Sequence, residues 1–138
     1  MKLHELKKEK KILLSDGAWG TELAKFGFEP GICPELFNIT KPEIIKTIAA
    51  GYAEAGSDII LTNTFGGSPL KLAKYGLESR VEELNETGVL LSVEASEKRV
   101  FVLASIGPTG DFLAPLGLIT EKEMIESFAR QVKAFIAS

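Results

Sequence analysis

The chain has 138 residues, of which 45% are hydrophobic and 25% charged, and its net charge is −3. This length and composition predict one globular domain, and so small a net charge argues against nucleic acid or an anionic membrane as a partner. No segment approaches the roughly 20 apolar residues of a membrane span. The single cysteine excludes an intrachain disulfide and fits a cytoplasmic location.

The first predicted elements are a polar helical lead-in over residues 1–11 and a short strand over 12–14. The basic run at 7–11 is interrupted by a glutamate, so we interpret it as a solvated helix face rather than a nucleic-acid or targeting patch. Residues 12–14 are an apolar run that ends at Asp16-Gly17, which indicates a buried strand. A short helix or turn is expected over 20–28.

The second unit is a helix followed by a strand. Thr40 and Glu43 have capping-box spacing, with Pro42 in the first turn, and Gly56 should end the helix. One face of that helix carries its apolar residues: Ile44, Ile45, Ile48, Ala49, Tyr52 and Ala53. Residues 58–63 are then apolar without polar alternation, which is typical of a strand covered on both faces.

The third unit repeats this order. Ser79 and Glu82 give the capping spacing before a helix whose apolar positions are Val81, Leu84, Leu91 and Ala95. Residues 100–104 are the third predicted strand. Thr120 and Glu123 repeat the spacing before the last helix, which has apolar residues at helical period: Met124, Ile125, Phe128, Val132, Phe135 and Ile136.

This alternation predicts an α/β fold with a mainly parallel sheet. A doubly wound sheet needs more strands than the three visible here, and a (β/α)8 TIM barrel takes about 250 residues. We therefore interpret residues 1–138 as the N-terminal portion, about three βα units, of an incomplete barrel domain, with a fourth strand expected to follow Ser138. The third strand would then be a free edge, and the helices after Thr40 and Thr120 would lack part of their cover, so these residues alone are expected to be marginally stable, or to self-associate or aggregate through the exposed sheet edge.

Three polar segments follow the three predicted strands, where parallel α/β enzymes place their chemistry. The first segment runs from Asp16 to Thr21. The exposed N–H groups of Gly17, Ala18 and Trp19 could hold a carboxylate while Asp16 pairs with an ammonium, which would make an amino-acid clamp. The alternative is a tight turn with Asp16 as a helix cap. Trp19 either stacks on a ligand or covers the barrel mouth.

The second and third segments are 62–67 and 105–110. Asn63 offers a donor and an acceptor, although a polar turn that caps the next segment explains it equally well. The third segment resembles a phosphate loop but lacks the Gly-Lys-Ser/Thr ending, and Pro108 removes one donor, so phosphate binding is disfavoured. Cys33 has no nearby histidine or second cysteine, so a plain loop cysteine is favoured over a nucleophile or metal ligand.

In order and spacing, the three segments resemble the N-terminal part of the homocysteine S-methyltransferase family. The matching stretches are Asp-Gly-Ala-Trp-Gly-Thr at 16–21, Ala-Gly-Ser-Asp-Ile-Ile-Leu-Thr-Asn-Thr-Phe-Gly at 55–66 and Ser-Ile-Gly-Pro-Thr-Gly at 105–110, followed by Pro-Leu-Gly at 115–117. The resemblance covers about 12–136 and is greatest to the homocysteine-binding barrel of cobalamin-dependent methionine synthases.

The resemblance implies a (β/α)8 barrel in which zinc ionises the thiol of homocysteine, which then accepts a methyl group to give methionine. In such a family the methyl group is carried by cobalamin, folate, betaine or a sulfonium donor. The sequence does not identify the donor, and the resemblance favours methylcobalamin or methyltetrahydrofolate, supplied through folate- and cobalamin-binding domains. Asp16 would hold the substrate ammonium, and Gly17, Ala18 and Trp19 its carboxylate, with Thr21 in the same motif. The other strand ends would be lined by Asn63, Thr64, Ser105 and Gly107.

The family's zinc-binding cysteines and a partner glutamate belong to later strands, so the resemblance places the cysteine ligands beyond Ser138, and Cys33 matches none of them. We therefore expect these residues alone neither to bind zinc nor to catalyse methyl transfer, so no catalytic residue or metal ligand is assigned here. Two other interpretations compete with this one. The chain could be part of another barrel enzyme that uses Asp16 as a general base, or it could be a non-catalytic α/β module.

Overall fold

The computed structural model describes residues 5, 8, 10 and 12–138, so most of the predicted lead-in over 1–11 lies outside the described residues. The helices are α2 (Trp19–Lys25), α3 (Phe37–Thr40), α4 (Pro42–Glu54), α5 (Pro69–Ala73), α6 (Val81–Ser96) and α7 (Glu121–Ala137). Two 3₁₀ turns, η1 (Pro34–Leu36) and η2 (Glu78–Arg80), and two strands, β1 (Ile59–Leu61) and β2 (Phe101–Leu103), complete the described elements. None of the described helices is long and apolar enough to span a membrane.

The two strands form the parallel sheet that the sequence predicts, with Ile60 opposite Val102. The strand predicted at 12–14 does not form: Ser15 makes one isolated parallel bridge to Ile59. Ile12 is 81% exposed and Leu14 57%, so the expectation of burial there is also wrong. The backbone at Leu14 and Asp16 hydrogen-bonds to Asp58 and Ile59 at the start of β1, but the side chains of Ile12 and Leu14 stay mostly exposed.

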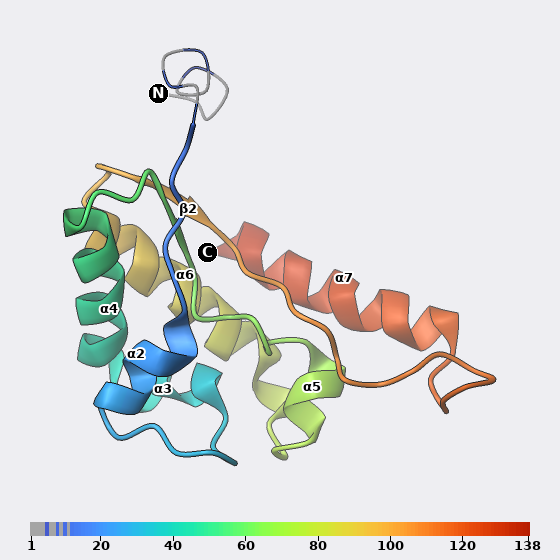
Figure 1. Ribbon diagram of the computed structural model, residues 1–138. Helices are drawn as coiled ribbons and strands as arrows, with labels where there is room; N and C mark the ends of the chain where they lie inside the picture. Colours follow the sequence, from blue (N-terminus) through green and yellow to red (C-terminus); the bar gives the residue numbers. More distant parts are fainter. Residues whose placement is uncertain (1–4, 6–7, 9, 11) are drawn as a thin grey trace.

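The three long helices lie side by side, with α6 in the centre between α4 and α7 (Figure 1). The short helices α2 and α5 lie near the carboxyl ends of the strands, at the lower edge of the molecule in Figure 1. The three predicted polar segments follow the carboxyl ends of the strands, so they approach one another below the sheet in this view.

Helix α4 begins at Pro42 and ends before Gly56, whose φ of 99° is the left-handed conformation expected of a C-terminal glycine. It buries Ile45 and Ile48 in a cluster with residues of α2, α3 and α6. The expectation that this face lacks part of its cover holds for Ile44, Tyr52 and Ala53, which are half-buried, while α2 and α3 cover the rest.

One of the three predicted capping boxes is confirmed. The Thr120 hydroxyl accepts a hydrogen bond from the Glu123 N–H at 3.2 Å, and the Glu123 carboxylate accepts one from the Thr120 N–H at 2.8 Å. Thr40 and Ser79 do not cap their helices. Each already lies inside a preceding helical turn, α3 or η2, so its backbone is not the extended one that an N-cap residue adopts.

Helix α7 leaves much of its predicted apolar face exposed: Ile125 is 59% exposed and Ile136 78%. It turns a small and polar stripe inward instead, made of Ser127, Gln131 and Ala134. The expectation that this helix lacks part of the cover for its apolar face is confirmed.

A ladder of buried side-chain amides joins the helices to the segment after β1. Asn38 of α3 donates to the carbonyls of Asn63 and Leu84, each at 2.9 Å. Asn85 of α6 donates to the Gly67 carbonyl at 2.8 Å, and Gln131 of α7 donates to the Thr64 carbonyl at 2.8 Å. These amides replace the backbone pairing that the loop at 62–67 lacks, because a buried carbonyl without a donor is costly.

Helix α6 approaches this loop closely at Gly88. A Cβ there would lie 2.6 Å from Asn38 Nδ2 and 2.7 Å from Thr64 Cγ2, whereas a Cβ on Gly51 of α4 would meet nothing within 4 Å. Alanine is worth about 1 kcal/mol over glycine inside a helix, but that gain is lost where the methyl group has no space.

We predict opposite effects for the two glycines. Gly51→Ala should raise the free energy of unfolding by about 0.5–1 kcal/mol, and Gly88→Ala should lower it by about 1–3 kcal/mol because the methyl group overpacks the amide ladder. Urea unfolding followed by circular dichroism measures both. Equal shifts in the two variants would contradict the close packing of α6 on the loop.

Candidate functional site

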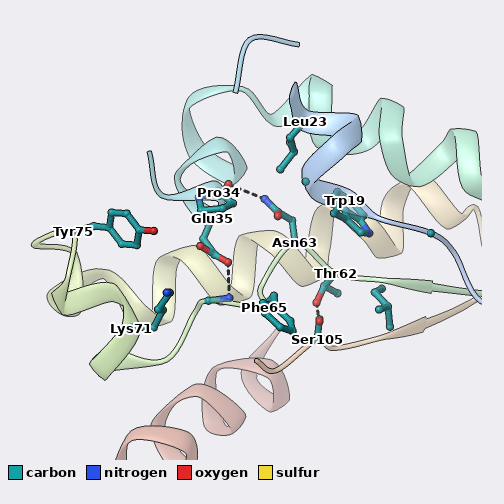
Figure 2. A pocket seen from close by; sticks show the side chains of 14 residues that line it. Trp19, Leu23, Pro34, Glu35, Thr62, Asn63, Phe65, Lys71, Tyr75 and Ser105 are labelled. Atoms are coloured by element: carbon teal, nitrogen blue, oxygen red, sulfur yellow. Dashed lines mark hydrogen bonds between the residues drawn. The ribbon is translucent and has the colours of Figure 1, made fainter. Parts of the chain in front are cut away.

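A cavity of about 470 Å³ opens where the three polar segments meet. Figure 2 shows its lining, with Trp19 at one end and Tyr75 at the other. Four of the nine predicted substrate-binding residues line it: Gly17, Trp19, Asn63 and Ser105. The other five, Asp16, Ala18, Thr21, Thr64 and Gly107, lie beside these in the chain without lining it. A cavity of this volume is in the range that encloses a drug-sized ligand.

Asp16 joins the first segment to β1 and to Trp19. Its Oδ2 accepts hydrogen bonds from the Leu61 N–H at 2.8 Å and the Trp19 indole at 2.9 Å, and Oδ1 accepts one from the Ser15 hydroxyl at 3.1 Å. The helix-cap interpretation of Asp16 is wrong, because Ala18 is the N-cap of α2 and no side chain caps it. The carboxylate is therefore a positioning group for Trp19, and Oδ1 keeps acceptor capacity beyond the Ser15 bond.

Tyr52 of α4 contacts the backbone of residues 17–19 and fixes it in place. The Tyr52 hydroxyl donates to the Ala18 carbonyl at 3.0 Å, and a Cβ on Gly17 would lie 3.0 Å from the same hydroxyl. The Gly17 and Ala18 N–H groups donate to no acceptor in the described part of the chain. They are therefore available to an anion. Thr21 faces away, with its exposed hydroxyl 3.3 Å from the Ala18 carbonyl.

Asn63 and Thr64 are buried, and their side-chain donors bind protein groups. The Asn63 side-chain amide donates to the Pro34 carbonyl and to Asn38 Oδ1, both at 2.9 Å. The Thr64 hydroxyl lies 2.6 Å from that of Thr62 and donates to the Ser105 carbonyl at 2.8 Å. These contacts fix the second strand end against the third.

Two N–H groups of the third segment donate to other groups of the protein. The Ser105 N–H donates to the Thr62 hydroxyl at 3.1 Å, and the Gly107 N–H donates to the Phe65 carbonyl at 2.8 Å. A Cβ on Gly107 would lie 2.5 Å from the Phe65 ring, which explains the glycine. With these two N–H groups occupied and Pro108 without one, the segment has fewer donors for a phosphate.

Glu35 is a buried carboxylate in the cavity wall that the sequence interpretation missed. It is 2% exposed, its Oε1 accepts the Gly66 N–H at 2.6 Å, and its Oε2 accepts the Cys33 thiol at 3.2 Å. The sequence did contain a signal for it, because Glu35 stands in an otherwise apolar stretch between Cys33-Pro34 and Leu36-Phe37. A charged side chain in such a stretch is buried only if it has partners, so it is a candidate site residue.

Cys33 is a protonated, buried thiol. Burial, the neighbouring charge of Glu35 and the hydrogen bond to Glu35 together raise the pKa of Cys33 to about 12. This agrees with the expectation of a plain cysteine, since the thiolate is the reactive and metal-binding form. In the described part of the chain, no group of three or more His, Cys, Asp or Glu side chains could hold a metal ion.

Ser138, beyond which the zinc ligands are expected, lies at the end of α7. It is the C-cap of α7, and its exposed hydroxyl donates to the Phe135 carbonyl at 2.7 Å. That hydrogen bond belongs to the last turn of the helix, and Ser138 does not line the cavity. The position of the cysteine ligands beyond this residue stays a prediction.

Lys71 and Tyr75 also line the cavity and also escaped the sequence interpretation. They lie four positions apart, beginning in α5, whose start is marked by Ser68 as a side-chain N-cap before Pro69. That Ser-Pro pair after Gly66-Gly67 was a readable helix-start signal. Burial raises the pKa of the Tyr75 hydroxyl, which stays a hydrogen-bond donor.

We predict that Cys33 resists alkylation in the folded protein. With the pKa raised from 9.0 to about 12, the thiolate fraction near pH 8 falls roughly a thousandfold. Iodoacetamide labelling followed by mass spectrometry should therefore be slow in the native protein and fast in concentrated urea. Similar rates under both conditions would contradict the burial of this thiol.

Comparison with known proteins shows that the chain matches a known family. Residues 13–138 match the homocysteine S-methyltransferase family. The methionine synthase of Mycobacterium tuberculosis (strain ATCC 25618 / H37Rv) is 32% identical over 121 residues, 78% of this chain and 10% of that protein. That of Mycobacterium leprae (strain TN) is 31% identical over the same length.

Solved structures agree with this assignment. The metallated form of the homocysteine methyltransferase MmuM from Escherichia coli superposes with a TM-score of 0.84 at 25% identity, covering 98% of this chain and 53% of that one. The oxidized form gives 0.80 at 23% identity, covering 98% and 52%. The chain thus spans about half the length of these structures and a tenth of the methionine synthases. By the match over almost its whole length, the chain belongs to the homocysteine S-methyltransferase family.

Proposed function

We propose that this chain supplies the amino-acid-binding part of a (β/α)8 barrel that methylates homocysteine to methionine in the cytoplasm, and that residues 1–138 form about three of its βα units. The observation that carries the proposal is the cavity, which brings Gly17, Trp19, Asn63 and Ser105 together at the carboxyl ends of the strands. Parallel α/β barrels bind their substrates at that end.

In this proposal the substrate carboxylate takes the free N–H groups of Gly17 and Ala18, with Trp19 beside them, and its ammonium approaches Oδ1 of Asp16. Asn63, Thr64, Ser105 and Gly107 shape the wall against which the side chain of the substrate lies. A carboxylate near an ammonium gains charge-assisted hydrogen bonds that a neutral ligand would lack. The charge pattern therefore favours a zwitterion over an uncharged thiol.

Thiol activation is proposed to come from zinc in the complete barrel, because a metal-bound thiol is deprotonated at neutral pH. The described residues do not fit a zinc site by themselves, since Cys33 is protonated and bonded to Glu35. The ligands are therefore assigned to the rest of the barrel, beyond Ser138, as are methylcobalamin or methyltetrahydrofolate and their domains.

We predict that Asp16→Asn, made in the complete protein, weakens homocysteine binding on the order of tenfold to a hundredfold. Asparagine keeps an acceptor for Trp19 and Leu61 but loses the charge that holds the ammonium. Binding of 4-mercaptobutanoate, which is homocysteine without its amino group, should not change. Isothermal titration calorimetry measures both ligands.

Glu43→Gln is the matched control, since that side chain is 84% exposed on α4 and its removal costs the same charge. Equal losses for homocysteine and 4-mercaptobutanoate in Asp16→Asn would contradict the ammonium contact. A wild-type protein that binds no homocysteine, and forms no methionine with either methyl donor, would contradict the proposed function itself.

We also predict that the purified 138-residue chain carries no stoichiometric zinc and forms no methionine, because its one cysteine is held as a buried neutral thiol. Metal analysis by mass spectrometry after dialysis against zinc tests the first statement. One bound zinc per chain would place metal ligands within these residues and contradict the assignment above.

A further inference from the structure

The backbone that would receive the substrate carboxylate is held by a side chain from outside the cavity. Gly17 and Trp19 line the cavity. Tyr52 of α4 does not, and it lines instead a second cavity of about 310 Å³ between α2 and α4. Its hydroxyl donates to the Ala18 carbonyl at 3.0 Å. Tyr52 therefore reaches the backbone of the amino-acid site without lining the space that a ligand would occupy.

This contact also sets the direction of a backbone donor. The Ala18–Trp19 peptide bond is trans, so the Ala18 carbonyl and the Trp19 N–H lie in one plane and point in opposite directions. Because the carbonyl points toward Tyr52, the Trp19 N–H points away from it. The Thr21 hydroxyl lies 3.3 Å from the same carbonyl, but it belongs to the same helical turn. Tyr52 is thus the contact that ties this peptide to another helix.

Tyr52 is itself fixed by packing and stays a hydrogen-bond donor. Its ring packs, as Trp19 does, against the apolar cluster that α4 forms with α2, α3 and α6. A Cβ on Gly17 would lie 3.0 Å from the Tyr52 hydroxyl and 3.2 Å from its ring carbon Cε1, so the two residues meet closely. Burial and the nearby charges of Glu22 and Asp16 raise the pKa of the Tyr52 hydroxyl, which keeps its proton at neutral pH.

We propose that Tyr52 is a positioning residue of the amino-acid site. Its hydroxyl orients the Ala18–Trp19 peptide so that the Trp19 N–H joins those of Gly17 and Ala18 as a third donor to the substrate carboxylate. The inference rests on the proposed function and adds the residue that aims this donor. Hydrogen bonds to a carboxylate are charge-assisted and weaken steeply when the donor is misaligned. Tyr52 therefore acts on carboxylate binding through the backbone and does not meet the ligand.

The test removes the hydroxyl and compares three thiol ligands of the complete protein that contains this chain. Tyr52→Phe keeps the packed ring and loses the hydrogen bond to the Ala18 carbonyl. The ligands are homocysteine, 4-mercaptobutanoate, which lacks the amino group, and 3-aminopropane-1-thiol, which lacks the carboxylate. By isothermal titration calorimetry, Tyr52→Phe should weaken binding of the first two ligands about threefold to tenfold. Binding of 3-aminopropane-1-thiol should not change, because that ligand has no carboxylate to accept from the backbone.

Thr47→Val is the matched control, since the Thr47 hydroxyl also donates from α4 to a backbone carbonyl, that of Glu43 at 2.8 Å, and should change none of the three affinities. Equal weakening of all three ligands by Tyr52→Phe would overturn the inference, as would an unchanged affinity for either carboxylate ligand. A wild-type protein that binds neither carboxylate ligand would overturn it as well. Tyr52-dependent binding of 4-mercaptobutanoate without any binding of homocysteine would support the positioning role and contradict the proposed function alone.

Discussion

The site depends on side-chain amides that hold an irregular loop in a buried position. The loop at 62–67 leaves β1 and enters the interior without a strand or helix to satisfy its backbone. Asn38, Asn85 and Gln131 reach it from three different helices and satisfy the carbonyls of residues 63, 67 and 64. Each amide arrives from a rigid element, so the loop takes one conformation and not several.

This arrangement also explains the division of the apolar core. One cluster gathers around Phe37 and Ile45, and a second around Leu72 and Leu84. The amide ladder runs in the polar region of the loop, where an apolar core would leave carbonyls without donors. The cavity lies at the same level, so its wall is built from a loop that cannot relax without breaking buried hydrogen bonds.

The sequence was sufficient for the elements whose signals are local. Pro42 and Gly56 mark the ends of α4, the capping box at Thr120 marks α7, and the runs around Ile60 and Val102 mark a parallel pair. The motif glycines pointed to the end of the sheet where the cavity opens. The capping-box spacing at Thr40 and Ser79 gave a wrong prediction, because both residues lie inside short helical turns that spacing alone does not reveal.

Sequence patterns missed the features that depend on contacts between distant segments. Asp16 looked like a cap or a free carboxylate, yet its Oδ2 bonds Leu61, 45 positions away. Glu35 and Lys71 meet the cavity only because the η1 turn and α5 converge on one loop. Leu14 follows the pattern of a buried strand, but burial needs an element on each face, and its side chain stays mostly exposed.

The buried thiol of Cys33 has a consequence for the thiol ligand that we propose for the cavity. Glu35 lines the cavity, and Cys33 lies behind it, bonded to its carboxylate and 3% exposed. An exposed or ionised cysteine so close to the cavity would exchange with oxidised substrate and trap it as a mixed disulfide, since thiolates carry that exchange. Keeping this sulfur neutral and covered leaves the ligand's own sulfur as the one reactive thiol at the wall formed by these residues.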